Sequence, residues 1–468
     1  MMGLMVSEET TRMTTSPTEQ QTPAATAASG EGGAHPEPRT AATRTWATRL
    51  VVVGIVLSAL NLRPAITSLG ALLEEVRDGL GMSGSVAGLL TSVPPLCFAV
   101  FGVMAPRLAR RFGPAAVVCA GMAAITAGLL IRPYAGNTIA FLAASALALM
   151  GIAVSNVLMP VIVKRWFPDR VGSMTGLYSM ALALGTSTAA AVTVPLTGAL
   201  GDSWKSGLAV WAALAAVAVP PWLPLLRDRG AAPAAEQPAA RTEEPAAEPA
   251  AHTARSARQD TARPRTEREE QAPALRITRS RTAWALAVFF GLQATAAYIT
   301  MGWMAQIFRD AGVAAGTAGL LLAVTMVMGV PLAFVIPRVA TRLPHQGPIV
   351  LVLGVCGLAG YAGLYLAPAG GAWAWAVLLG VSNCAFPLAL TMVGMRARTG
   401  AGVAQLSAFA QSTGYLISIP GPLLVGVLYQ SSGGWGLPIA LMTALMIPQM
   451  LVGWVAGRNR TVEDETAR

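Results

Sequence analysis

Charged residues are scarce in this sequence. Lys, Arg, Asp and Glu make up 12% of its 468 residues, about half the share in a typical soluble domain. They gather in an N-terminal stretch, a central segment and short stretches between long apolar runs, and hydrophobic residues reach 54%. This composition excludes a soluble globular protein, and the apolar runs predict an all-α membrane protein.

Acidic residues and histidines are missing from every apolar run. The three histidines, His35, His252 and His345, lie outside these runs. Without a buried carboxylate or imidazole, no nucleophile and base can be paired at membrane depth. The four cysteines form no C-x-x-C pair, so we expect neither a disulfide framework nor a metal site. The sequence therefore argues against an enzyme, and we expect no cofactor.

The sequence also lacks the features of a nucleic-acid-binding protein and of a cleaved signal peptide. The net charge is +10, but the basic N-terminal stretch and the basic central segment contain no Phe or Tyr that could stack on bases, so we expect no nucleic-acid partner. No apolar run precedes Trp46, so we expect no cleaved signal peptide.

Twelve apolar runs are each long enough to cross a hydrocarbon core about 30 Å thick, which takes about 20 residues. They lie at residues 49–73, 84–106, 114–132, 138–161, 172–199, 207–226, 282–308, 314–337, 348–367, 372–395, 402–429 and 435–457. We therefore predict a tail (1–47), a six-helix bundle (48–226), a linker (227–281), a second bundle (282–457) and a tail (458–468). The first tail and the linker are predicted to be disordered, because they have too few large apolar residues to form a core.

Basic residues alternate between the loops. Ten occupy one set of short loops and four the other, and an excess of Lys and Arg marks the cytoplasmic side. The ten are Arg107, Arg110, Arg111, Lys164, Arg165, Arg170, Arg338, Arg342, Arg396 and Arg398, and the four are Arg77, Arg132, Lys205 and Arg309. We therefore expect a multi-pass protein of the inner (plasma) membrane with both termini and the linker in the cytoplasm.

The two halves resemble each other in sequence. Residues 155–160 read Ser-Asn-Val-Leu-Met-Pro in the fourth run, and residues 382–387 read Ser-Asn-Cys-Ala-Phe-Pro in the tenth. The pair Pro106-Arg107 with Arg111 after the second run matches Pro337-Arg338 with Arg342 after the eighth. These matches predict two pseudo-symmetric six-helix halves packed around a central site.

Arg63 is the only basic residue that the sequence places well inside a span, about 20 Å along the helix from Leu50. An arginine facing lipid at that depth costs at least about 2.5 kcal/mol, so it is expected to face a polar cavity or a partner. Pro64 frees a backbone carbonyl and is expected to kink the helix beside it. Arg63 is a candidate seat for an anion, and the alternative is a structural arginine that snorkels or bonds to helix carbonyls. We also expect Arg63 to have no acidic partner within the bilayer.

Further polar residues lie in the spans. The candidates for substrate binding are Arg63, Asn61, Asn156, Gln293, Tyr298, Asn383 and Gln411, and the candidates for gating are Pro64, Arg107, Arg111, Arg338 and Arg342. The two asparagines could instead join helices to one another, which polar residues commonly do in membrane bundles. Glu74, Glu75 and Asp78, beyond the first span, are expected to form a solvated face.

The chain resembles the major facilitator superfamily in its two six-helix halves, its central linker and its basic loop after the second span. Within it, residues 61–64 (Asn-Leu-Arg-Pro), 164–167 (Lys-Arg-Trp-Phe) and 289–293 (Phe-Phe-Gly-Leu-Gln) are similar to the cyanate and nitroimidazole transporter family. The loop after the second span departs from the superfamily pattern because Arg110 occupies its acidic position. The resemblance implies secondary transport of a small anionic or polar solute by alternating access.

We therefore predict a monomeric transporter, active or facilitative, of a small cyanate-like or nitroimidazole-like solute in a lipid bilayer. The alternative within the same superfamily is a multidrug or metabolite exporter. Such exporters usually carry a membrane-embedded carboxylate for proton antiport, and the spans contain none.

Overall fold

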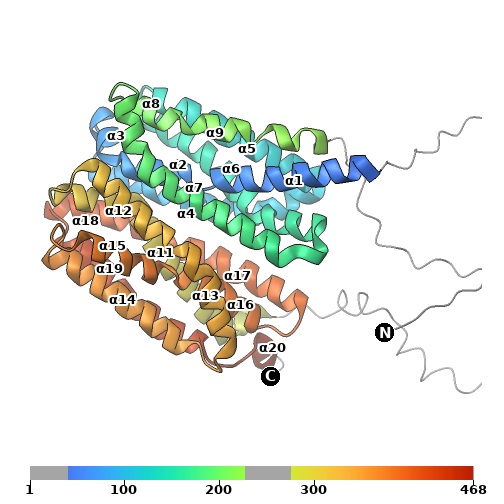
Figure 1. Ribbon diagram of the computed structural model, residues 1–468. Helices are drawn as coiled ribbons and strands as arrows, with labels where there is room; N and C mark the ends of the chain where they lie inside the picture. The colour runs from blue at the N-terminus through green and yellow to red at the C-terminus, as the bar shows by residue number, and fades with distance from the viewer. Residues whose placement is uncertain (1–40, 227–275, 467–468) are drawn as a thin grey trace, which may run out of the picture. The chain divides into compact units, whose positions relative to one another are not determined.

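Long helices run side by side through the computed structural model, which describes residues 41–226 and 276–466 (Figure 1). The predicted linker, apart from its last residues, and most of the predicted N-terminal tail lie outside the described residues. The chain divides into two units, residues 1–44 and 45–468. Of the first unit only residues 41–44 are described, as the start of a helix, and everything below concerns the second unit.

The N-terminal half contains five long membrane-spanning segments among the described residues, followed by a series of short helices and turns. Its helices are α1 (Ala41–Asn61), α2 (Pro64–Ala71), α3 (Leu73–Gly79), α4 (Gly84–Phe112), α5 (Pro114–Ile131), η1 (Arg132–Tyr134), α6 (Thr138–Trp166), η2 (Pro168–Arg170), α7 (Val171–Ala199), α8 (Trp204–Ala209), α9 (Trp211–Val217), η3 (Pro220–Trp222) and η4 (Pro224–Leu226). Helices α1 and α2 together form the first span.

The C-terminal half repeats this arrangement. Its helices are η5 (Ile277–Arg279), α11 (Arg281–Asp310), α12 (Ala315–Val327), α13 (Gly329–Arg342), α14 (Gly347–Leu366), α15 (Ala372–Asn383), α16 (Ala385–Met395), α17 (Gly400–Ser418), α18 (Pro420–Ser432), α19 (Gly436–Ala456) and α20 (Val462–Thr466). The pairs α12–α13, α15–α16 and α17–α18 each form one broken span.

Eleven of the twelve predicted spans are long apolar helices within the described residues. The run at 207–226 differs, because it consists of the short helices α8 and α9 followed by the turns η3 and η4. Pro220, Pro221 and Pro224 lack the backbone N–H that a continuous helix needs. The segment is nevertheless held to α1, since the indole of the buried Trp222 donates to Ser58 Oγ at 3.0 Å.

The structure repeats one detail of packing in both halves, as the duplicated sequence predicts. Ser155 of α6 packs against Gly121 of α5, where an added Cβ would lie 2.5 Å from the serine oxygen. Ser382 of α15 packs in the same way against Gly357 of α14, also at 2.5 Å. In each half, the serine of the recurring Ser-Asn pair therefore lies where two neighbouring helices pack closely against each other.

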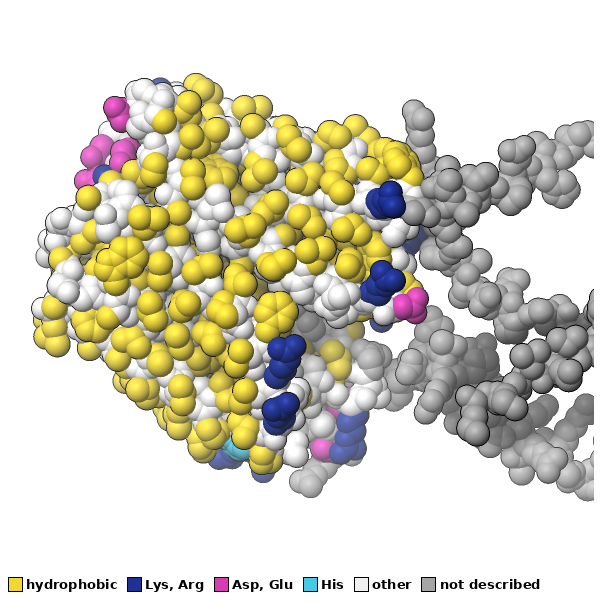
Figure 2. Space-filling view, viewed as in Figure 1, with side chains coloured by type: hydrophobic (Ala, Val, Ile, Leu, Met, Phe, Trp, Pro, Cys, Tyr) yellow, Lys and Arg dark blue, Asp and Glu magenta, His cyan; other side chains and the backbone are white. Residues whose placement is uncertain are grey.

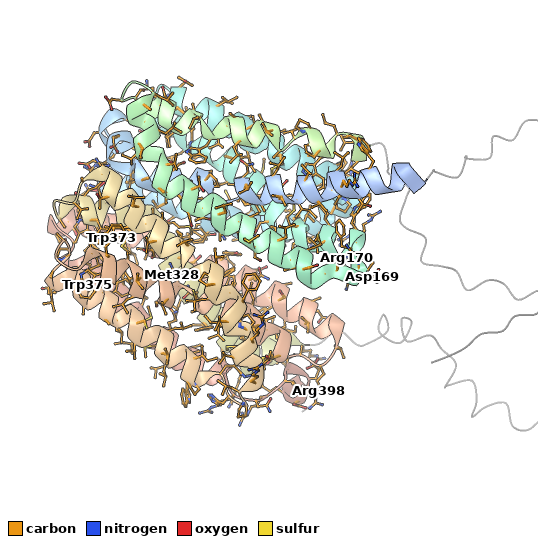
Figure 3. All side chains as sticks on the ribbon, viewed as in Figure 1. Asp169, Arg170, Met328, Trp373, Trp375 and Arg398 are labelled. Atoms are coloured by element: carbon orange, nitrogen blue, oxygen red, sulfur yellow. The ribbon has the colours of Figure 1, made fainter. Side chains whose placement is uncertain are left out.

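The two ends of the bundle differ in charge. Glu74, Glu75 and Asp310 lie at the end that carries α3, which we call the acidic end (Figures 1 and 2). The other end, which we call the basic end, carries exposed arginines such as Arg170 and Arg398, whereas Trp373 lies near the acidic end (Figure 3). The basic end also holds α20 near the C-terminus.

The halves are joined by polar contacts at the acidic end. Arg309 of α11 pairs with Glu74 at 2.8 Å and with Glu75 at 2.9 Å. Gln430 of α18 accepts from the N–H and the hydroxyl of Ser85 in α4, at 2.9 and 2.8 Å. In the part of the chain that the structure describes, no hydrogen bond or ion pair crosses between the halves at the basic end.

Candidate functional site

Arg63 lies at a break in the first span. Helix α1 ends at Asn61 and α2 begins at Pro64, with Leu62 and Arg63 in the turn between them. Proline is tolerated at the first position of a helix because the N–H it lacks has no partner there. The N–H groups of Ile66 and Thr67 bond back to the Arg63 carbonyl. The helix break predicted beside Arg63 is therefore present, and Arg63 lies between the ends of α1 and α2.

Aromatic side chains surround this guanidinium. The Arg63 Cζ lies 5.8 Å from the ring centre of Phe98, which is within the range of a cation–π contact. Tyr298, Tyr415 and Tyr178 are its phenolic neighbours. Among the described residues no carboxylate pairs with Arg63. Its charge is met by phenols and ring faces.

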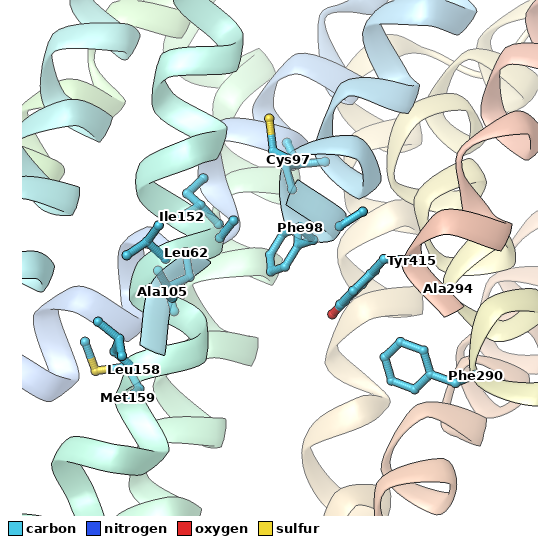
Figure 4. Packing of buried hydrophobic residues seen from close by; sticks show 14 of the residues in the cluster. Leu62, Cys97, Phe98, Ala105, Ile152, Leu158, Met159, Phe290, Ala294 and Tyr415 are labelled. Carbon is cyan, nitrogen blue, oxygen red and sulfur yellow. The ribbon is translucent and has the colours of Figure 1, made fainter. Parts of the chain in front are cut away.

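The rings come from both halves of the protein. Phe98 of α4 lies 5.0 Å from Tyr415 of α17 and 6.5 Å from Tyr298 of α11, measured between ring centres. Tyr415 also packs edge-on against Phe290 at 5.2 Å, and Phe290 lies 5.5 Å from Phe386 of α16. Figure 4 shows Phe98 on one side of the interface and Tyr415 and Phe290 on the other. We call Arg63, Phe98, Tyr178, Tyr298 and Tyr415 the central site.

Asn156 reaches this site through a tyrosine. The hydroxyl of Tyr178 on α7 donates to Asn156 Oδ1 on α6 at 2.6 Å. This bond fixes the direction of the Tyr178 proton and leaves oxygen lone pairs that can accept a further hydrogen bond. The amide therefore joins two helices and at the same time orients a phenol of the central site.

The other predicted amides are engaged elsewhere. Gln293 donates to the carbonyl of Asn383 at 3.0 Å and to its Oδ1 at 3.3 Å, and accepts from Gln449 at 2.8 Å. Asn61 donates to the carbonyls of Leu57 and Leu214. Both sets of bonds hold helices together.

Gln411 bonds within its own helix, to Ser407 at 2.7 Å. The structure thus brings together Arg63, Tyr298 and, through Tyr178, Asn156. The hydrogen bonds of Asn61, Gln293, Asn383 and Gln411 given above go to other residues than Arg63.

The arginines predicted to gate lie at the basic end. Arg107, Arg111, Arg338 and Arg342 are all exposed, and none has an ion pair with a described residue. The ion pairs between the halves lie at the opposite end, where Glu74 and Glu75 bind Arg309. The face expected to be solvated is partly so, since the two glutamates are 33% and 31% exposed, and it also carries ion pairs between the halves.

Arg132 corrects a second expectation. The sequence placed it in a loop and left Arg63 as the only basic residue inside a span, but Arg132 is 1% exposed. Its Nη1 donates to the Ala65 carbonyl at 2.9 Å and its Nη2 to Ser68 Oγ at 3.4 Å. These bonds attach η1 to the first turns of α2. A buried arginine therefore contacts the helix that follows Arg63.

Sequence comparison identifies the class of protein. Residues 51–404 match the family model of the Major Facilitator Superfamily, and the chain belongs to that superfamily. It is a multi-pass membrane transporter and not an enzyme. The twelve-helix fold in two pseudo-symmetric halves is confirmed by this match and by the solved structures that the chain resembles.

Three individual transporters are similar to this chain over most of its length. An uncharacterized transporter of Bacillus subtilis, YycB, is 32% identical over 88% of this chain and 94% of its own length. The 2-nitroimidazole transporter of Escherichia coli is 28% identical over 88% and 96%, and the cyanate transport protein CynX of the same organism is 27% identical over 85% and 94%. The predicted resemblance to cyanate and nitroimidazole transporters is thereby confirmed.

Solved structures show the same fold at lower sequence identity. The xylose transporter XylE of E. coli in its inward open conformation has a TM-score of 0.68 at 11% identity, covering 90% of this chain and 99% of that one. The nucleoside transporter NupG has a TM-score of 0.64 at 13% identity, covering 88% and 98%.

Proposed function

We propose that this protein carries a small, planar, anionic or strongly polar solute across the plasma membrane by alternating access, with Arg63 as the seat of the solute. The observation that carries the proposal is the central site itself. An arginine without a carboxylate partner among the described residues is ringed by aromatic side chains from both halves. A guanidinium binds anions and polar groups, and aromatic faces accept a flat solute.

The named relatives support this solute class. Cyanate is a small anion, and a nitroimidazole is a flat ring with a strongly polar nitro group. Both fit a site with one cation and several aromatic rings better than a site built for sugars, where many hydrogen-bonding amides would be expected. Several of the amides here bond to other parts of the protein instead.

The proposed orientation places the basic end in the cytoplasm, following the excess of exposed arginines there. The acidic end would then face outward, and the contacts of Glu74 and Glu75 with Arg309 would hold that side closed. Alternation would consist of breaking these contacts and closing the basic end around the same central site. We propose a monomer as the working unit, since each chain contains both halves.

The experiment is uptake of labelled cyanate and of 2-nitroimidazole into vesicles that contain the purified protein. Arg63→Gln is expected to lower transport and binding by about ten- to a hundredfold, because a hydrogen bond to a charged group contributes about 1.5–3 kcal/mol. Arg170→Gln is the control, since it makes the same change of charge on the exposed basic end. Equal transport by Arg63→Gln and the unmodified protein would overturn the proposal.

A further inference from the structure

Arg132 has a hydrogen-bonding group without a described partner. Its two terminal nitrogens bond to Ala65 and Ser68, but no described residue accepts from its Nε, although the side chain is 1% exposed. No described carboxylate pairs with it either. A buried guanidinium that lacks both a counter-charge and one of its hydrogen bonds is costly in a membrane protein, so such residues usually mark a functional site.

A second unpartnered group faces the same space. Ser145 of α6 is 1% exposed, and its hydroxyl has no partner among the described residues. Arg132 and Ser145 both line a cavity between α2, α4, α6 and α11. Because both groups are donors, the cavity presents two free N–H and O–H groups to whatever occupies it.

The size of the cavity limits its occupant. It leaves about 10 Å³ for the centre of a water-sized sphere, which is room for one small particle. A flat ring such as a nitroimidazole is far larger. A water molecule could accept both hydrogen bonds but would leave the charge of Arg132 uncompensated. A monatomic anion would accept both hydrogen bonds and would also compensate the charge.

We propose that this cavity binds one halide-sized anion, held by Arg132 Nε and the Ser145 hydroxyl. The site is separate from the seat proposed for the transported solute and does not depend on that assignment.

The cavity also bears on the closed acidic end. Tyr298 and Gly302 of α11 form its wall on the side of the C-terminal half, while Arg132 and Ser145 belong to the N-terminal half. Tyr298 is also one of the phenols around Arg63. Separation of the halves would remove one wall, so the anion should bind more tightly to the state in which the acidic end is closed.

The test measures thermal unfolding of the purified full-length protein in gluconate, with increasing bromide. A saturable rise in the melting temperature is expected, because a ligand that binds only the folded state stabilises it. Arg132→Gln should weaken the apparent bromide affinity by at least about tenfold, and Ser145→Ala by a smaller factor. In Arg63→Gln the part of the bromide response that Arg132→Gln removes should remain, which separates this site from the proposed transport site.

Ser155→Ala is the matched control, because it removes another buried, unpartnered serine hydroxyl from the same helix α6. If Arg132→Gln does not fold, Arg132→Lys and Ser145→Ala provide the comparison, and the anomalous signal of bromide in crystals of the unmodified protein locates the ion directly. A bromide peak beside Arg132 supports the proposal. A melting temperature that does not respond to bromide, or a response that both Arg132→Lys and Ser145→Ala leave intact, overturns it.

Discussion

Removing the charge of Arg309 should open the acidic end. Its guanidinium holds two carboxylates of the opposite half, Glu74 at 2.8 Å and Glu75 at 2.9 Å. The side chain of Arg309 is 16% exposed, and those of the two glutamates 33% and 31%. Pairs that remain this accessible to solvent contribute about 0.5–1 kcal/mol each, so the two together contribute about 1–2 kcal/mol.

This free energy acts on an equilibrium between two states. Since about 1.4 kcal/mol corresponds to a tenfold change, Arg309→Gln should raise the ratio of acidic-end-open to acidic-end-closed molecules by about 5- to 30-fold. Glu74→Gln combined with Glu75→Gln should give a similar shift. Adding Arg309→Gln to that double variant should change little more, because the same contacts would already be lost.

Pulsed electron paramagnetic resonance between two spin labels can measure the shift. Suitable positions are Gly136, in the turn between η1 and α6, and Ala369, in the turn between α14 and α15, since both are exposed and lie in different halves. The longer distance should gain population in Arg309→Gln. Lys205→Gln is the control, because Lys205 contacts Trp204 of its own half. An unchanged distance distribution in Arg309→Gln would refute the assignment of these contacts as a lock between the halves.

Two other predictions test how helices and termini are held. In Gly88→Val the new Cβ would lie 2.8 Å from the Leu423 carbonyl oxygen of α18. Because overpacking costs about 1–3 kcal/mol, the same spin labels should report more open molecules. Gly316→Ala is the control and should leave the distances unchanged, since nothing lies within 4 Å of a Cβ added there. Glu465→Gln should lower the melting temperature at pH 7, because Glu465 accepts hydrogen bonds from the Ser280 hydroxyl and from the N–H and hydroxyl of Thr282. Partial burial raises the pKa of Glu465, but these bonds outweigh it and lower the pKa below its ordinary value. Their stabilisation is present above the unfolded pKa of about 4.3 and is lost as the pH falls through the lower folded value. The difference in melting temperature between the two proteins should therefore shrink below about pH 4, and a constant difference down to pH 3 would contradict this role.

Spans and helix breaks could be predicted because they depend on local sequence. Apolar length alone located eleven long helices among the described residues, and Pro64 marked the break beside Arg63. The sixth run was predicted as an ordinary span, but its prolines divide it into short turns. Its side chains are apolar enough to lie in a membrane. A continuous helix also needs a backbone N–H at each position, and a hydropathy measure does not register the N–H groups that proline lacks.

The burial of Arg132 could not be predicted in this way. Arg132 directly follows helix α5, so from the sequence it was assigned to a loop. Only the packing of α2 brings the Ala65 carbonyl within 2.9 Å of its guanidinium. The ion pairs of Arg309 with Glu74 and Glu75 join residues more than 230 positions apart. Such partners depend on how the two halves dock, and the spacing along the chain does not determine that.

The class of protein, the number of apolar runs, the duplication of the halves and the position of one arginine at a helix break could all be read from the sequence. These properties follow from hydrophobicity, proline and local repetition, which act over a few turns of helix. The tertiary structure alone decided which polar side chains meet. It gathers Tyr298, Tyr415 and Tyr178 around Arg63 and leaves Gln293 bonded to Asn383, because the pairing of polar groups inside a membrane depends on the packing of helices distant in sequence.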